Sequence, residues 1–214
     1  MAIIWTNIEN GETGLSVRTK VNNLGLSVAT VSTEFDNAKG DIAAIDNRVT
    51  TLEGLSHKIG FADYSDSATS TTPISVTGGA GYVDLTNDGL GVYTIKTYLP
   101  DGVTDVYDSS INRFDFSELS LGDMLDIRLD IEVTTTSPSQ QVDIALELGT
   151  STFPYEIPFI TNVYKAAGVH KVNRYNGIYI GNNDTLNGGG RFRIKSDANC
   201  TVKVNGWYVK ITAQ

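Results

Sequence analysis

The segment from residue 21 to residue 59 carries an apolar side chain at alternating intervals of three and four residues. One set of positions holds Val21, Val28, Phe35, Ile42 and Val49, and the other holds Leu24, Val31, Ala38, Ile45, Leu52 and Ile59. Ser56 is the one polar residue in this series. Such a spacing over five heptads predicts a coiled-coil helix. Because one thin apolar stripe cannot form a core by itself, we expect the chain to assemble with copies of itself.

The composition of this stripe bears on the number of copies. Both sets of positions mix β-branched residues with other apolar side chains, whereas parallel dimers favour β-branched residues at one position and Leu at the other. We therefore expect a homotrimer with the stripe as its core. Gly40 followed by Asp41 offers an alternative, in which the helix stops and returns as an antiparallel hairpin. The stripe passes Gly40 in unchanged phase, which favours one helix over residues 17–59.

From residue 74 onward the apolar residues follow a period of two. Leu125, Ile127, Leu129, Ile131 and Val133 alternate with charged residues, and similar alternation runs through 142–148 and 202–211. Clusters of Asn, Asp, Pro and Gly separate these segments and indicate turns. Eight to ten short strands without a helical stretch predict an all-β domain, an antiparallel β-sandwich with the jelly roll as the preferred arrangement.

These patterns divide the chain into four parts. A short segment, 1–16, precedes the coiled-coil stalk, 17–59. The stretch 60–73 is polar and rich in Ser and Thr, which is typical of a linker. Residues 74–214 form the β-sandwich, called the knob below.

The charge of the chain excludes some partners. Asp and Glu outnumber Lys and Arg by 25 to 16, giving a net charge of −9. Nucleic-acid binding rests on neutralising phosphates with basic residues, so no nucleic-acid partner is expected. No run approaches the 18 apolar residues of a membrane span, and the start of the chain lacks a secretory leader, which predicts assembly in a cytoplasm. The single cysteine, Cys200, cannot form an internal disulfide and is expected to be a small buried side chain.

Residues that could carry catalysis or bind metal are sparse. His57 and His170 have no second ligand at metal-binding spacing. Asp126, Asp130 and Glu132 share one strand face in steps of about 7 Å. Glycosidases pair carboxylates at such distances, but a solvated face on an acidic protein is the preferred interpretation.

Two further patterns resemble ligand-binding sequences. Asp101, Asp105 and Asp108 could bind Ca²⁺ from one loop, although their spacing is not that of an EF-hand. The glycines of 78–81 lack the Lys-Ser/Thr of a phosphate-binding loop. We therefore expect no enzymatic activity, no cofactor and no resident metal.

Residues 6–22, Thr-Asn-Ile-Glu-Asn-Gly-Glu-Thr-Gly-Leu-Ser-Val-Arg-Thr-Lys-Val-Asn, resemble the N-terminal opening of tailed-bacteriophage fibre and appendage proteins. In that family an Ile-Glu-x-Gly-Glu-x-Gly-x-x-Val-Arg-x-Lys-Ile/Val-Asn stretch precedes a trimeric stalk. The match covers 17 of the 214 residues. The tip, ending in residues 204–211, is loosely similar to the trimeric jelly-roll knobs of the TNF and C1q kind.

The resemblance implies a role for each part of the chain. The N-terminal segment would dock to a virion protein, through Ile3, Ile4, Trp5, Ile8, Gly11, Glu12 and Gly14. The knob would face a receptor on the host surface, as part of a tail fibre or a head fibre. Two alternatives are a capsid-decorating or tail-accessory trimer that binds only other virion proteins, and a depolymerase. The short chain and the lack of a carboxylate-rich groove disfavour the depolymerase.

Aromatic rings and amide or carboxylate groups are the side chains that bind sugars. Tyrosines are frequent in the predicted turns and strand edges of the knob. The candidate receptor contacts, for a receptor that includes saccharide, are Tyr107, Asp108, Asn182, Asn183 and Asp184.

Overall fold

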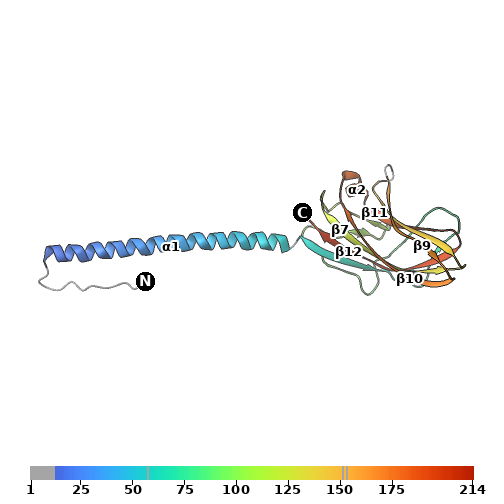
Figure 1. The fold of residues 1–214 in the computed structure, drawn as a ribbon, viewed down its shortest axis with the longest axis horizontal. Helices are drawn as coiled ribbons and strands as arrows, with labels where there is room; N and C mark the ends of the chain where they lie inside the picture. Colours follow the sequence, from blue (N-terminus) through green and yellow to red (C-terminus); the bar gives the residue numbers. More distant parts are fainter. Residues whose placement is uncertain (1–12, 57, 151, 153) are drawn as a thin grey trace. The chain divides into compact units, whose positions relative to one another are not determined.

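The computed structural model describes residues 13–214 apart from residues 57, 151 and 153. The chain divides into two compact units, residues 1–54 and 55–214. The first unit is dominated by α1, Gly14–Ser56, a single helix of 43 residues (Figure 1). It continues through Gly25 and Gly40, so the hairpin alternative is excluded. At a rise of 1.5 Å per residue the helix is about 65 Å long.

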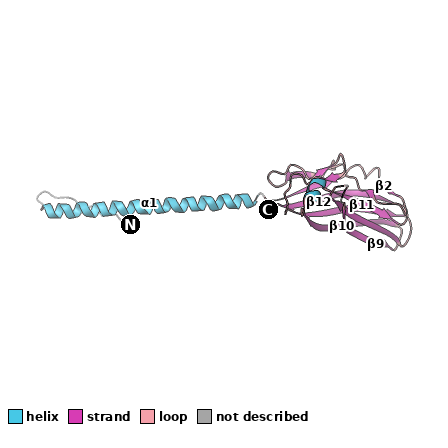
Figure 2. Ribbon diagram, turned by 90° about the horizontal axis from the view of Figure 1, so that it is seen from above, coloured by secondary structure: helices cyan, strands magenta, loops and turns pink. Residues whose placement is uncertain are grey.

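The second unit is an antiparallel β-sandwich of two sheets (Figure 2). The first, sheet A, has the order β10-β7-β12-β1-β4, and β2 also pairs with β12. Its strands are β1 (Ile59–Ser65), β2 (Ile74–Val76), β4 (Ile95–Tyr98), β7 (Met124–Thr135), β10 (Gly168–Tyr179) and β12 (Cys200–Thr212). Sheet B has the order β5-β6-β11-β8-β9, and β3 pairs with β11. Its strands are β3 (Val83–Asp84), β5 (Tyr107–Asp108), β6 (Arg113–Phe114), β8 (Gln140–Leu148), β9 (Tyr155–Tyr164) and β11 (Gly190–Ser196).

The strand order identifies the sandwich as a jelly roll. When the short strands β2 to β5 are left aside, the chain passes in turn through β1, β6, β7, β8, β9, β10, β11 and β12. Successive strands of this series lie in opposite sheets except for the β8–β9 hairpin. This path interleaves the two sheets as two Greek keys, the pattern of the jelly roll. The predicted antiparallel sandwich and its preferred arrangement are therefore confirmed. One element was not predicted, the six-residue helix α2 (Asn183–Gly188).

The core lies between the two sheets. In β7 the five predicted inward residues, from Leu125 to Val133, are all fully buried. Trp207 lies at the centre of an aromatic cluster, with its ring centroid 5.1 Å from that of Phe192 and 6.3 Å from that of Tyr107. Cys200, at the start of β12, is buried as predicted, and it pairs with Val76 of β2 and Thr135 of β7.

The boundary between stalk and knob differs from the prediction. Residues 59–65, expected to end the stalk and begin a linker, form β1, which lies between β12 and β4. Ile59 pairs with Thr212 and so belongs to the sheet, not to the helical stripe. The rest of the expected linker is also bound to the knob, since the Thr69 hydroxyl donates to the carbonyl oxygen of Val204. The inward positions of β1 include Gly60 and Ala62, whose small side chains hide the alternation that marks a strand.

Candidate functional site

The apolar stripe of α1 is uncovered in one copy of the chain. Phe35 is 69% exposed, Ile42 68% and Leu52 63%, and the other stripe residues between Val21 and Val49 are exposed as well. Burying a large aliphatic or aromatic side chain contributes about 1.5–3 kcal/mol. A stripe of this length therefore favours association strongly, and nothing else in the described part of the first unit could cover it.

The predicted virion-attachment residues can be placed only in part. Ile3, Ile4, Trp5, Ile8, Gly11 and Glu12 lie outside the described residues. Gly14 is the first residue of α1, so it belongs to the helix and not to a separate segment. His57 also lies outside the described residues.

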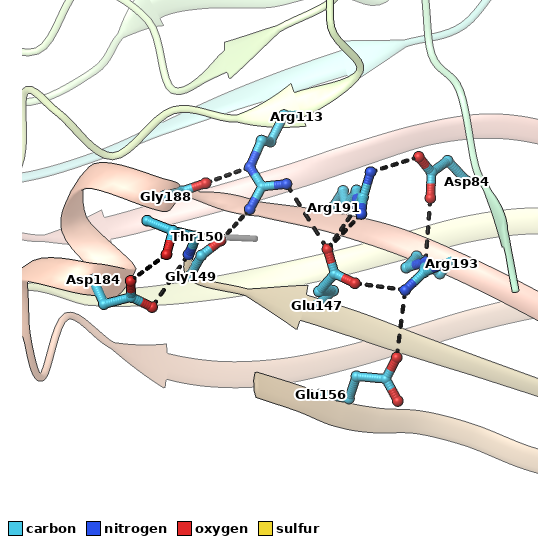
Figure 3. A network of polar contacts seen from close by, with 10 residues as sticks. All are labelled: Asp84, Arg113, Glu147, Gly149, Thr150, Glu156, Asp184, Gly188, Arg191 and Arg193. Atoms are coloured by element: carbon cyan, nitrogen blue, oxygen red, sulfur yellow. Dashed lines mark hydrogen bonds and ion pairs between the residues drawn. The ribbon is translucent and has the colours of Figure 1, made fainter. Parts of the chain in front are cut away.

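A network of ion pairs covers the outer face of sheet B (Figure 3). At its centre Glu147 is only 5% exposed. Its carboxylate accepts a hydrogen bond of 2.7 Å from Nε of Arg191 and one of 2.5 Å from the Arg193 guanidinium, and a guanidinium nitrogen of Arg113 lies 3.9 Å away. Asp84 of β3 pairs with Arg191 at 2.9 Å and with Arg193 at 3.2 Å. The network thus joins β3, β6, β8 and β11 by ion pairs between three arginines and two carboxylates.

Arg113 extends this network to the loops at one end of the sheet. Its guanidinium donates to the carbonyl oxygens of Gly149 and Gly188 (Figure 3). Burial and the neighbouring Arg191 lower the pKa of Arg113. Beside it, the Asp184 carboxylate accepts hydrogen bonds from the backbone N–H and the hydroxyl of Thr150. These contacts hold α2 and the loop after β8 in place.

The structure gives most of the candidate receptor contacts internal roles. Tyr107 is buried, and its hydroxyl donates to the carbonyl oxygen of Asn87 at 3.1 Å, so its ring offers no face to a sugar. Asn182 caps α2 by accepting from the Thr185 N–H, and Asp184 is engaged as described above. Asn183 is exposed, and Asp108 is half-buried. Asp108 accepts from the N–H and hydroxyl of Ser110, which lower the pKa of its carboxyl.

The predicted acidic loop is also organised by internal contacts. The Asp105 carboxylate accepts a 2.5 Å hydrogen bond from Lys96 and one of 2.6 Å from the Tyr64 hydroxyl. Lys96, Asp105, Asp108 and Glu118 line an open depression of about 340 Å³. Within residues 13–214, excepting 57, 151 and 153, no three His, Cys, Asp or Glu side chains lie close enough to hold a metal ion. The structure of the described residues therefore gives no support to a Ca²⁺ site formed by Asp101, Asp105 and Asp108.

The outer face of sheet A carries the carboxylates considered for glycoside hydrolysis. Asp126 lies 4.0 Å from Lys210, and Glu132 lies 3.9 Å from Lys203. Asp130 accepts from the side-chain amide of Asn205 at 3.2 Å. The three groups are thus distributed among separate partners along β7. The same face also holds several exposed aromatic residues. The sequence alone does not identify them as a group, because the register of the strands determines which of them are neighbours.

His170, the other candidate ligand, stacks on the Tyr164 ring with centroids 4.1 Å apart. Its Nε2 lies 3.1 Å from the Thr135 hydroxyl. The histidine therefore takes part in the packing of β7, β9 and β10. No helix in the described part of the chain is long and apolar enough to cross a membrane.

Comparisons with known proteins yield only distant structural likenesses. No family model and no curated protein matches the sequence. The Eiger TNF of S. frugiperda is 8% identical with a TM-score of 0.42, over 73% of this chain and 94% of that one. A vertex protein of PRD1 is 11% identical with a TM-score of 0.39, over 72% of each chain. At these values the likenesses carry no argument about function, and the jelly-roll assignment rests on the strand order itself.

Proposed function

We propose that this chain is a homotrimeric fibre of a tailed bacteriophage. Residues 1–16 attach it to the virion, α1 forms the stalk, and the knob binds the host surface. The observation that carries the proposal is the exposed 3-4 stripe from Val21 to Leu52 of α1, a surface suited to copies of the same helix. The resemblance of residues 6–22 to phage fibre openings supports the virion role. Three identical knobs would add avidity to a weak contact.

Assembly can be tested by sedimentation equilibrium of the full chain. We expect the mass of a trimer at micromolar concentration, and a monomer would overturn the proposal. Ile45→Asp places a charge in the stripe and should weaken the assembly at least tenfold. Ala43→Asp adds the same charge two residues away, off the stripe, and should leave the mass unchanged.

The place of the protein and its partner can be tested on intact particles. Gold labels on each end of the chain should appear at the particle surface, with the C-terminal label farther out. Purified trimer should bind host cells saturably, and the double variant Asp108→Ala with Asn183→Ala should reduce binding, since Asn183 is exposed and Asp108 is only half-buried.

A specific observation also supports a second candidate, a virion accessory trimer that binds only other virion proteins. Tyr107, Asn182 and Asp184 are engaged within the knob, so fewer groups are free to meet a receptor. If labelled trimer fails to bind host cells at micromolar concentration but binds particles that lack it, the accessory role replaces host attachment.

A further inference from the structure

The outer face of sheet A is divided along its strands into an apolar end and a polar end. The ladders place residues in rows across the sheet. The first row contains Tyr179, Met124, Thr212 and Ile59, and the second contains Gly177, Asp126, Lys210, Phe61 and Tyr98. The third contains Tyr175, Arg128, Tyr208, Asp63 and Ile95. Beyond the third row the outward residues are Asn, Asp, Glu, Lys, Ser, Thr and Gly, except for Val169.

The apolar end is called the aromatic end below and is defined by Ile59, Phe61, Tyr98, Met124, Tyr179 and Tyr208. Tyr179 is 68% exposed, Tyr98 59%, Ile59 57% and Met124 54%. Phe61 stacks between its neighbours, with its ring centroid 5.1 Å from that of Tyr98 and 5.7 Å from that of Tyr208. The rings border an open depression of about 340 Å³. Contiguous exposed apolar surface on a soluble domain marks an interaction site.

The charges within this region cancel one another. Arg128 lies 3.6 Å from Asp63 and its guanidinium sits 5.1 Å above the Tyr208 ring, while Lys210 lies 4.0 Å from Asp126. The chain as a whole carries a charge of −9, so two copies repel each other at most orientations. Two aromatic ends can approach without that repulsion. Tyr, Phe and Met without unpaired charge are also the composition of an interface core.

The position of this surface in the chain favours another copy as its occupant. Ile59 opens the first row and comes three residues after Ser56, the end of α1. Three residues span at most about 11 Å, similar to the diameter of one helix. Helices joined along their stripes would therefore hold the knobs of different copies at high effective concentration. The apolar surface lies at the end of the sheet where the chain enters.

We propose that the aromatic end of sheet A is a second self-association surface, occupied by another copy of this chain. This inference rests on the proposed homotrimer and adds the contact that joins the knobs. The two surfaces then have different roles. The stripe of α1 brings the copies together, and the aromatic end determines how their knobs pack against one another.

Oxidation of Met124 by hydrogen peroxide tests the inference in the full chain. The sequence has two methionines, Met1 and Met124, so mass spectrometry of the peptides reads Met124 directly. With N-acetylmethionine as an added reference, we expect Met124 of the wild-type trimer to react at least tenfold more slowly than the reference. In Ile45→Asp diluted to monomer, its rate should rise to within a few-fold of the reference.

Matched variants locate the protected surface. Tyr179→Glu, within the aromatic end, should raise the Met124 rate and the dissociation constant of the assembly at least tenfold. Val169→Glu changes an exposed apolar residue on the same strand and face but at the polar end, and should alter neither. Trp207 fluorescence checks that each variant folds, and Tyr98→Glu replaces Tyr179→Glu if the latter does not.

The outcomes separate the two proposals. A sedimenting trimer whose Met124 reacts at the reference rate would overturn the knob contact and leave the homotrimer standing. A monomeric wild type would overturn the homotrimer itself. Protection of Met124 that appears only when host polysaccharide is added would assign the aromatic end to a glycan instead of a second copy.

Discussion

At the scale of single residues, the knob depends on charges that are almost fully enclosed. Glu147 faces Arg113, Arg191 and Arg193, and its side chain is 7% exposed. Removing one partner from such a group leaves unbalanced charge in a poorly solvated place, which costs more than the pair contributes on its own. The stability of the knob therefore depends on Glu147 and its three arginine partners as a group, more than on any single contact between them.

Glu147→Gln should lower the free energy of unfolding of the knob by about 3 kcal/mol, because three guanidinium groups lose their shared counter-charge. Urea unfolding followed by Trp207 fluorescence measures the change. Glu156→Gln is the matched control, since Glu156 is 43% exposed and lies 3.6 Å from Arg193. It should cost less than about 1 kcal/mol. Equal effects in the two variants would show that enclosure does not matter here.

Asp105 makes the stability of the knob depend on pH. Burial opposes its ionisation, but hydrogen bonds from Lys96 and Tyr64 outweigh burial and lower the pKa of the carboxyl. The folded state therefore binds a proton less readily than the unfolded state, whose carboxyl pKa is about 3.9. The stabilising contribution is complete above that value and is lost as the pH falls through the lower folded value.

Asp105→Asn should accordingly destabilise the knob at pH 7 and have a smaller effect at pH 3. Urea unfolding of wild type and variant at both pH values measures this difference, and comparing the two proteins cancels the titration of other carboxyls. A difference that stays constant or grows between pH 7 and pH 3 would contradict the assigned role.

At the scale of elements, α1 contains a weakness that can be removed. Gly40 lies off the apolar stripe, and a Cβ added there meets nothing within 4 Å. Gly40→Ala should stabilise the helix by about 1 kcal/mol per chain and raise its melting temperature by circular dichroism at 222 nm. Gly206→Ala is the contrasting variant, because its Cβ would lie 2.7 Å from the carbonyl oxygen of Tyr64 and should destabilise the knob. A lower helix melting temperature in Gly40→Ala would show that Gly40 has a role beyond the helix backbone.

Elements with strong periodicity were predictable from sequence. The 3-4 spacing predicted α1, and the alternation in β7 predicted a strand with one buried face, because in both cases the spacing of apolar residues matches the repeat of the element. Strand β1 was missed because Gly60 and Ala62 occupy inward positions where large apolar residues would have shown the period. For the same reason residues 60–65 were assigned to the expected linker instead of to β1.

The surfaces were harder to predict than the elements. Tyr107 was expected to contact a receptor, yet it packs against Trp207 in the core, since a tyrosine near a turn can point to either side of a strand. The Glu147 network joins residues from 84 to 193, and the aromatic end joins residues from 59 to 208. The residues of each set come together only because of the register in which the strands pair, and the periodicity of the sequence does not reveal that register.

At the scale of the whole molecule, the two units obtain their stability from different sources. The knob has its own buried core, whereas α1 has a single stripe that one copy cannot cover. Isolated helices gain little from propensity alone. We therefore expect the temperature at which the helix signal is lost to rise with protein concentration, as mass action requires. Circular dichroism at 222 nm over a hundredfold concentration range measures this, and a constant midpoint would contradict assembly through the stalk.

The buried position of Cys200 provides a way to follow the opening of the knob in the full chain. The thiol is the chain's one sulfhydryl, it is 2% exposed, and burial raises its pKa. Thiol reagents react with the exposed thiolate, so labelling must wait until β12 separates from the three-residue strand β2 or the whole sandwich opens. The labelling rate therefore measures how often the knob opens, and this measurement needs no engineered probe.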